Sequence, residues 1–541
     1  MRQFTPRASD WSLPFTLPIF RPGFPHGVFM RTRRTGALLL FGLTLSACAG
    51  PATRVSPVAA PVPAAEQAEA TITANDMYAR IAFLADDALR GRNTPSPGLE
   101  VAAAYIASEF RRMGLEPAGD NGTYLQRYPF ITRVLDTEAA AVELRAGDTR
   151  TTLTYAVDTY VSPGQPATAE SQVVYAGSIV DPAHGDALRG RVVAISAPDA
   201  FDRTFRAQVA RARAIATAAG ARALLVVLGP SASQGDIARQ ASAAASTRAI
   251  QPEVPVAFVR RDQAVAAFRA AGSDLAALEA RSASAPVAVD GLTVTVTAPF
   301  RDTDHRPPNV AAVLPGSDPA LRDTYIVLSA HFDHVGVGAP DATGDSIYNG
   351  ADDDASGTAG ILEVAEAFAS LPVPPRRSLL FLAVSGEEKG LLGSRWFSDN
   401  PTVPIEAIVA NVNLDMIGRN APDSIVVIGQ EFSSMGPLVQ RIATERPDLG
   451  LTVAEDIWPD ENFFFRSDHF NFARKEIPAL FFFAGVHEDY HRPSDHVEKI
   501  DTDKAARITR LVYWLTSALA NDPQPPQWTG EGLERVRQLT Q

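Results

Sequence analysis

Cysteine is almost absent from this chain of 541 residues, which contains only Cys48. A disulfide between two cysteines of the chain is therefore excluded. Long apolar runs are also missing, since none reaches the about 18–20 residues that a membrane-spanning helix needs. Basic residues are in the minority: 49 Lys and Arg stand against 62 Asp and Glu, which leaves a formal charge of -13. This acidic balance argues against nucleic acid as the main partner.

The composition is otherwise that of a globular protein. Hydrophobic residues make up 46% of the chain, which excludes wholesale disorder. The length predicts two to four domains, or one enlarged enzyme domain with an insertion. Nothing in the composition sets the oligomeric state, which stays open.

The N-terminal segment has the three parts of a secretory signal. Three arginines lie between residues 31 and 34, residues 36–45 form a short apolar core, and residues 45–48 read Leu-Ser-Ala-Cys. The apolar core is too short to remain as a membrane-spanning helix. Residues 1–48 are therefore predicted to be a signal segment, with Met30 as an alternative start to Met1.

The single cysteine stands at the end of this segment. The sequence Leu-Ser-Ala-Cys resembles a bacterial lipobox, which implies lipid attachment at Cys48; the alternative is a cleaved signal with an incidental cysteine. Residues 49–70 are rich in Pro and Ala and are predicted to be a tether. We therefore expect export from a bacterial cell, to the periplasm or as an outer-membrane or cell-surface lipoprotein. Contact with a membrane is expected only through that lipid.

The rest of the chain divides into four stretches. Residues 71–134 show the apolar spacing of helices. Residues 135–295 alternate short β-like runs with turns, and carry one histidine, His184, and no clustered carboxylates. Residues 296–523 alternate apolar runs with helical segments, and residues 524–541 form a Pro-rich, then weakly helical tail. The second stretch thus differs in character from the stretches on either side, and the resemblance described below implies that it is inserted into a domain made of the first and third.

Five apolar runs in the third stretch suit buried strands. They are residues 325–330, 378–384, 407–414, 425–428 and 479–483. Helical segments lie between them, and such alternation predicts a parallel sheet covered on both faces. The predicted fold class is α/β, with a mixed, mainly parallel sheet sandwiched by helices.

Polar side chains follow four of these runs directly or closely. They are His331 and Asp333, Glu387 and Glu388, Asp415, and His491. Ligands of open α/β sheets bind at the carboxyl ends of the strands, so these side chains are expected at one rim. A further cluster, residues 350–357, contains Asp353 among small residues and precedes a helix. Histidines together with carboxylates suit zinc.

A pair of zinc ions would need more than terminal ligands. A carboxylate would have to bridge the two ions, and a Glu beside them would serve as general base. Asp333 lies two residues beyond His331, where its carboxylate could orient the imidazole.

Several motifs carry a resemblance to a known family. The segments "LSAHFDHVG", "YNGADDDASGTAGILE", "AVSGEEKGLLGS", "NLDMIG", "RSDHFNFARKEIPALFFF" and "DYHRPSD" resemble the zinc-dependent exopeptidases of the bacterial leucyl aminopeptidase and aminopeptidase Y type. The segment "LADDALRGR … GLEVAAAYIASEFRRMGLEPAG" resembles their N-terminal part. The resemblance covers about residues 71–130 and 305–505, so it implies a dizinc exopeptidase fold.

The resemblance implies two zinc ions per chain and a defined set of site residues. These are His331 and Asp415 on one ion, Glu388 and His491 on the other, Asp353 bridging both, Glu387 as the general base or acid, and Asp333 as a supporting carboxylate. It also implies a cis peptide bond between Asp353 and Asp354.

One expected group is missing. Some members of the family have a Tyr a few residues before "SDH" that stabilises the oxyanion, but residues 463–465 of this chain are Phe. Tyr490, His469 and His487 are the alternative candidates.

The inserted stretch, residues 135–295, has a resemblance of its own. The run "LRGRVVAI … ARARAIATAAGARALLVV … VPVAFV" looks like a protease-associated domain. The alternative is an unrelated α/β insertion.

Other motifs are interpreted as structural. Residues 487–491 match the HExxH pattern of single-zinc endopeptidases, but that motif works only on a helix, and Gly485 and Pro493 flank it. Ser467 in "SDH" is interpreted as supporting other side chains, because adjacent residues rarely form a catalytic triad. Asp352 and Asp354 are interpreted as turn and helix-cap residues.

His334 and His496 are placed at the surface or in support of the ligands. Neither is assigned to a metal ion.

The sequence is therefore interpreted as that of an exported zinc aminopeptidase acting on peptides with a free N-terminus. The resemblance implies that a water between the ions attacks the first peptide carbonyl and that Glu387 passes its proton to the leaving amine. A carboxypeptidase or an aminoacyl cyclase on the same fold is the alternative. A carboxypeptidase would need a basic group for the terminal carboxylate, for which Arg395, Arg419 and Arg466 are candidates. A catalytically dead binding lipoprotein is a further alternative.

Overall fold

The computed structural model describes residues 63–540, except 166, 179, 198–200, 202, 245, 249–252 and 282–284. The predicted signal segment, Met30, Cys48 and residues 49–62 of the predicted tether lie outside the described residues.

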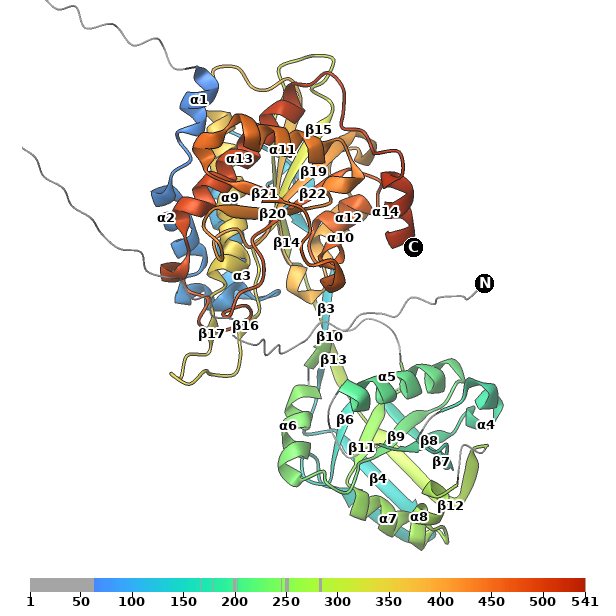
Figure 1. The fold of residues 1–541 in the computed structure, drawn as a ribbon. Coiled ribbons are helices and arrows are strands. Elements are labelled where there is room, and N and C mark those ends of the chain that lie inside the picture. Colours follow the sequence, from blue (N-terminus) through green and yellow to red (C-terminus); the bar gives the residue numbers. More distant parts are fainter. Residues whose placement is uncertain are drawn as a thin grey trace, which may run out of the picture. The chain divides into compact units, whose positions relative to one another are not determined.

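A nine-stranded sheet forms the centre of the larger domain (Figure 1). In spatial order its strands are β1 (Glu116–Pro117), β14 (Pro308–Leu314), β18 (Ser378–Val384), β15 (Tyr325–His331), β19 (Ile408–Leu414), β22 (Ala479–Phe483), β20 (Ser424–Ile428) and β21 (Thr452–Ala454), with β2 (Leu125–Arg127) also paired to β14. The four strands β18, β15, β19 and β22 are parallel. Antiparallel pairing of β14 with β18 and of β20 with β22 makes the sheet mixed, which confirms the predicted fold class.

Helices cover both faces of this sheet. They are α2 (Ala74–Leu84), α3 (Pro97–Arg112), α9 (Gly357–Ala369), α11 (Met435–Glu445) and α13 (Thr502–Asn521) on one face, and α10 (Leu392–Asp399) and α12 (His469–Ala473) on the other. The first set shares one apolar core with alternate residues of the strands, and the second set packs into a separate core. Residues of β18 are buried on both faces, which is why this strand reads as an unbroken apolar run.

The N-terminal end of the described chain differs from the expected tether, whereas the C-terminal end is helical, as expected. Residues 64–69 form α1 (Ala64–Glu69), in which Ala68 is buried and Glu69 pairs with Arg446. The tether prediction is therefore wrong for this part, because alanine and glutamate favour helix and Ala68 finds a place in the core. At the other end α14 (Gly532–Thr540) buries Val536 against Phe432 and its neighbours.

The inserted stretch has a sheet and apolar cores of its own. Its eight strands are, in spatial order, β5 (Thr149–Leu153), β4 (Ala141–Ala146), β12 (Val287–Thr297), β7 (Thr168–Tyr175), β8 (Val192–Ser196), β9 (Ala223–Val227), β11 (Val256–Val259) and β6 (Thr159–Ser162). Its helices are α4 (Gly185–Leu188), α5 (Arg203–Ala218), α6 (Gln234–Ala244), α7 (Arg261–Ala270) and α8 (Leu275–Glu279). Strand β12 continues past residue 295 to Thr297, and the protease-associated assignment stays a prediction.

Paired strands lead into and out of the inserted stretch. Arg127 of β2 pairs with Pro308 of β14. Further along, β3 (Phe130–Leu135) pairs antiparallel with β13 (Phe300–His305), and β10 (Ser246–Arg248) adds a third strand to this small sheet. The chain therefore enters and leaves the insertion along one antiparallel ladder.

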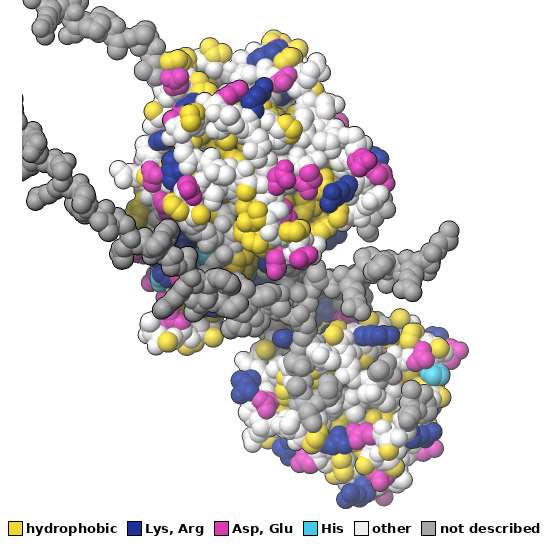
Figure 2. Space-filling view, viewed as in Figure 1, with side chains coloured by type: hydrophobic (Ala, Val, Ile, Leu, Met, Phe, Trp, Pro, Cys, Tyr) yellow, Lys and Arg dark blue, Asp and Glu magenta, His cyan; other side chains and the backbone are white. Residues whose placement is uncertain are grey.

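The visible surface carries charges of both signs. On the face drawn in Figure 2, Asp and Glu side chains lie among Lys and Arg side chains over the described residues. Within that part of the chain, no helix is both long and apolar enough to cross a membrane.

A buried ion cluster ties the N-terminal helices to α9. Arg80 on α2 is 6% exposed, and its Nε lies 2.6 Å from Oε1 of Glu363, which is 2% exposed. Glu109 and Glu366 also contact Arg80, but each pairs with the half-exposed Arg112 as well. Arg80 is thus the side chain that neutralises Glu363.

We expect Arg80→Met to lower the free energy of unfolding by about 3–5 kcal/mol, because it leaves Glu363 buried without its cation. Arg112→Met should cost about 1 kcal/mol or less, since Arg112 is solvated. Urea unfolding of both variants measures the difference. Equal costs would contradict this assignment, and Arg80→Met combined with Glu363→Leu should recover much of the loss.

Candidate metal centre

The predicted site residues lie at one edge of the nine-stranded sheet. His331 ends β15, and Asp415 follows the last residue of β19. Glu387 and Glu388 open a 3-10 turn that follows β18, and His491 lies in the loop after β22. These strands are parallel, so their carboxyl ends bring the side chains together.

The first group of side chains surrounds His331. Its Nε2 lies 3.2 Å from Oδ1 of Asp353 and 3.5 Å from Oδ1 of Asp415. All three residues are buried, with exposed fractions of 6% or less.

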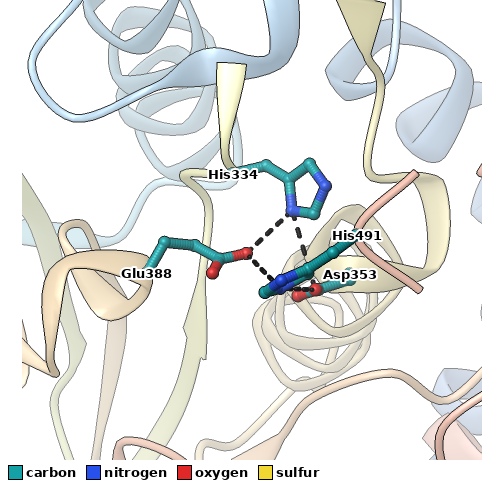
Figure 3. Close-up of side chains that lie close together, drawn as sticks. All are labelled: His334, Asp353, Glu388 and His491. Carbon is teal, nitrogen blue, oxygen red and sulfur yellow. Dashed lines mark ion pairs between the residues drawn. The ribbon is translucent and has the colours of Figure 1, made fainter. Parts of the chain in front are cut away.

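The second group shares Asp353 with the first. His491 Nε2 lies 3.1 Å from Oδ2 of Asp353 and 3.1 Å from Oε1 of Glu388 (Figure 3). Asp353 therefore presents one carboxylate oxygen to each group. The peptide bond after it, to Asp354, is cis, which confirms the expectation.

A third histidine belongs to the second group. His334 is fully buried, and its Nδ1 lies 2.9 Å from Oε1 of Glu388 and 3.6 Å from Oδ2 of Asp353. A surface position for His334 is therefore wrong. Strand alternation would point it away from His331, but β15 ends at His331 and the chain turns there.

The electrostatics of the second group favour a cation. Burial and the neighbouring Asp353 oppose ionisation of Glu388, yet the imidazoles of His491 and His334 hold its pKa at about 2. Burial works against the charge of His491 too, but Glu388 and Asp353 raise its pKa to about 10. Carboxylates and imidazoles in such a cluster are the ligand types that zinc prefers, so the residues fit a divalent metal.

Asp333 is placed to support two neighbours. Its Oδ1 accepts a hydrogen bond from the backbone N–H of Glu387 and its Oδ2 accepts one from Thr94 Oγ1. The same Thr94 hydroxyl accepts the N–H of Gly386. The imidazole of His331 has its Nδ1 3.1 Å from the backbone oxygen of Asp333 and 3.8 Å from the carboxylate. Asp333 thus holds the turn that carries Glu387.

Asp352 and Asp354 organise the backbone, as expected. Asp354 Oδ1 accepts the N–H groups of Gly357 and Met416, and its Oδ2 accepts that of His331. Asp352 Oδ1 accepts the N–H of Gly418. Both oxygens of Asp354 therefore accept hydrogen bonds from the backbone. Asp354 also lies close enough to His331 and Asp415 to form a possible metal-binding group with them.

A hollow opens beside the first group. It is lined by His331, Asp353, Glu387 and Asp415, and by Met416, Phe463, Arg466, Phe481, Phe483, Val486 and Tyr490. Burial raises the pKa of the Glu387 carboxyl well above its usual range, and the nearby Glu388 adds to this rise.

The hollow separates the three candidates for the missing oxyanion group. Tyr490 lines it, and burial together with Asp353 and Glu388 raises the pKa of its hydroxyl, which stays protonated. His487 is buried elsewhere, with Nε2 3.3 Å from Asp352. His469 packs flat on Phe481 and edge-on to Phe464, within the core. Tyr490 is the candidate that remains.

The structure shows why neither the HExxH-like residues 487–491 nor Ser467 forms the active site that its sequence pattern resembles. Residues 487–491 form a loop and turns, so His487 and His491 do not share a helix face. Ser467 Oγ donates to Asp415 Oδ2 and accepts from Asn413, which confirms its supporting position.

The three arginines that could bind the terminal carboxylate of a substrate have different surroundings. Arg419 pairs with the buried Asp489, and Arg395 is exposed beside Asp399. Arg466 lines the hollow, with its guanidinium 4.6 Å from the ring centre of Phe463.

Comparison with known proteins relates the part of the chain that carries most of the site to a described family. Residues 309–516 match the sequence model described as "Peptidase family M28". The chain is 27% identical over 214 residues to "Leupeptin-inactivating enzyme 1" of Streptomyces exfoliatus, which covers 39% of this chain and 43% of that protein. It is 36% identical over 260 residues to a "Probable zinc metalloprotease" of Pyrenophora tritici-repentis, covering 41% and 58%.

A third relative and a solved structure are also similar to this chain. A "Probable leucine aminopeptidase" of Arthroderma benhamiae is 25% identical over 225 residues, covering 40% of this chain and 59% of that protein. The chain thus spans about half the length of the curated relatives it matches. The aminopeptidase from Aneurinibacillus sp. strain AM-1 superposes with a TM-score of 0.50 at 21% identity, covering 85% of this chain and 97% of that one, which shows a common fold.

We expect acid to destabilise the fold partly through His469. Burial lowers its pKa to about 3, below the value of about 6.5 in an unfolded chain. Below pH 6.5 the unfolded chain takes up a proton at this histidine, whereas the folded chain does not until about pH 3. The free energy of unfolding therefore falls with pH below 6.5, by about 2–3 kcal/mol at pH 4.5. His469→Gln should flatten the fall in unfolding free energy between pH 6.5 and 4.5, measured with urea. His184→Gln is the control at a partly exposed histidine, and an equal slope in both variants would contradict this prediction.

Proposed function

We propose that this chain, whose residues 309–516 match the sequence model of peptidase family M28, is a dizinc aminopeptidase that removes residues from the N-termini of peptides. One observation carries the proposal. Two groups of histidines and carboxylates, buried except for the partly exposed His491, share Asp353, and Glu387 lies beside them at the hollow.

The donor set suits two zinc ions. His331 and Asp415 would hold one ion, Glu388 and His491 the other, and Asp353 both. When bound, zinc supplies Lewis-acid polarisation of a peptide carbonyl and makes a nearby water easier to deprotonate.

Glu387 is the proposed proton carrier. Its carboxylate would take the proton of the attacking water and deliver it to the leaving amine. The raised pKa of Glu387 suits this double task, because a group that is too acidic would not retain the proton. Asp333 and Thr94 fix the turn from which Glu387 projects.

Tyr490 is the proposed oxyanion donor. It lines the hollow together with Glu387, and its ring stacks on that of His491 at 3.9 Å. A protonated hydroxyl there can donate a hydrogen bond to the oxygen that gains charge during attack.

The lining of the hollow suggests which side chain precedes the scissile bond. Met416, Phe463, Phe481, Phe483 and Val486 make its wall largely apolar. We infer a preference for a large apolar residue at the substrate N-terminus, in keeping with the name of the leucine aminopeptidase relative.

Arg466 favours a second candidate function. It is the one of the three considered arginines that lines the hollow, where it could bind a terminal carboxylate. A carboxypeptidase acting on short peptides therefore remains the alternative.

The cellular setting is proposed from the sequence alone. The signal-like residues 1–48 and Cys48 support export with lipid attachment. The hydrophobic pattern of residues 135–295 supports a protease-associated domain.

The purified protein should cleave peptides that have a free N-terminus and leave N-acetylated copies intact. Peptides with a free N-terminus and an amidated C-terminus should still be cleaved, because recognition lies at the amine. We expect Glu387→Gln to abolish turnover while zinc per chain, measured by elemental mass spectrometry, stays at the level of the unaltered protein.

The outcomes separate the alternatives. Cleavage that requires a free C-terminus would favour the carboxypeptidase and overturn the aminopeptidase. Loss of zinc in Glu387→Gln would overturn the role given to this residue.

Tyr490→Phe keeps the ring stacked on His491 but removes the hydroxyl. Loss of one oxyanion donor costs about 100–1000-fold in kcat, so we expect a fall in this range with little change in KM. Steady-state kinetics measure it, with Tyr348→Phe as a control at a partly exposed tyrosine whose hydroxyl bonds Ala339. An unchanged kcat would exclude Tyr490 from the reaction.

A further inference from the structure

The ring of His334 is held firmly against the second group of side chains. The backbone N–H of His334 donates to the oxygen of Arg92, and Arg92 Nε donates to the oxygen of the nearby Phe332. On its other side the ring lies against Gly350, where a Cβ would come within 2.5 Å of its Cγ. Gly350 thus allows a close approach that any other residue would block.

Four atoms from different segments converge beside this ring. They are Nδ1 of His334, Oδ2 of Asp353, Oε1 of Glu388 and Nε2 of His491, all within 4.8 Å of one another (Figure 3). The two imidazole nitrogens lie 2.9, 3.1, 3.1 and 3.6 Å from the two carboxylate oxygens. Ligands of a tetrahedral zinc at about 2.0 Å lie about 3.3 Å apart, so these four separations are close to those that such an ion requires.

Most of these atoms are buried without a hydrogen bond. Among the described residues, Nδ1 and Nε2 of His334, Oδ2 of Asp353 and Oε1 of Glu388 have no hydrogen-bond partner. Unsatisfied polar atoms are costly in a protein interior. A cation at the point where three of them meet would satisfy them together.

The first group offers fewer protein ligands. It consists of His331, Asp415 and one oxygen of Asp353. Asp354 lies close by, but both of its oxygens accept backbone N–H groups. The hollow opens at this group: its lining includes His331, Asp353 and Asp415, but neither His334 nor Glu388.

We propose that His334 is a fourth protein ligand of the ion held by Glu388 and His491, so that the two metal positions are unequal. The inference builds on the proposed function, since it concerns the same pair of ions. Four protein ligands close a tetrahedral position, as in structural zinc sites, whereas three leave a place open, as in catalytic ones. The position of His331 and Asp415, facing the hollow, is the open one.

A competing role for His334 is a hydrogen bond from Nδ1–H to Glu388. Such a partner outside the ligand set typically changes metal affinity by about 10–100-fold. Loss of a direct ligand would in addition lower the number of imidazoles bound to the ion.

X-ray absorption at the zinc edge tests the unaltered protein. With two ions bound, we expect three imidazoles shared between them, contributed by His331, His334 and His491. If the protein retains a single zinc, that ion should have two imidazole ligands. Two imidazoles for two ions, or one for a single ion, would overturn the proposal.

His334→Asn tests the same proposal by affinity. We expect the dissociation constant of one zinc to rise by more than about 100-fold, beyond the effect of an outer partner, and one imidazole to disappear from the absorption spectrum. His496→Gln is the matched control, because His496 is partly exposed and pairs with Asp345 outside the two groups. A smaller loss with an unchanged imidazole count would assign His334 to the hydrogen bond and overturn the ligand role.

These readouts do not depend on turnover. A protein that cleaves peptides but has two imidazoles for two ions would retain the proposed function and lose this inference. A protein with three imidazoles and no peptidase activity would do the reverse.

Discussion

The carboxylate of Asp354 is the contact on which the rest of the site depends. Its two oxygens accept the backbone N–H groups of His331, Gly357 and Met416. These residues lie at the end of β15, the start of α9 and just past the end of β19, so one side chain ties together the three segments that deliver His331, Asp353 and Asp415. Because Asp354 is fully buried, its contacts fix the spacing of these three candidate metal ligands within the folded chain.

The N-terminal helical segment supplies the next layer of support. Arg92 is fully buried and donates to the backbone oxygens of Phe332, Asn349 and Gly350, which places its charge beneath two loops of the site. Burial lowers its pKa to about 10, while Asp333 and Asp353 favour its charge. Thr94 completes this layer through Gly386 and Asp333. Both residues lie outside the stretch that matches the family, so that stretch alone does not contain the whole site.

Much of this arrangement was predictable from the sequence, and the failures have physical reasons. Buried parallel strands are apolar throughout and end in polar residues, so the runs before His331 and Glu387 marked both the sheet and its functional edge. The sequence left His334 between the surface and a supporting position, because its contacts depend on how the chain turns after β15, which no periodicity encodes. The three oxyanion candidates could be distinguished only by the structure, because the sequence does not show which of these side chains lines the hollow and which is buried in the core. A helix at residues 64–69 was hidden by the Pro and Ala that precede it.

The ladder that joins β2 to β14 and β3 to β13 makes the whole insertion, topologically, the loop of a long β-hairpin. A hairpin tolerates loops of very different length, because closing a longer loop costs little additional entropy. Shortening this one to a tight turn would leave the order of all nine strands of the main sheet intact. This topology allows the smaller domain to be gained, lost or exchanged during evolution without a change in the strand order that positions the candidate metal centre.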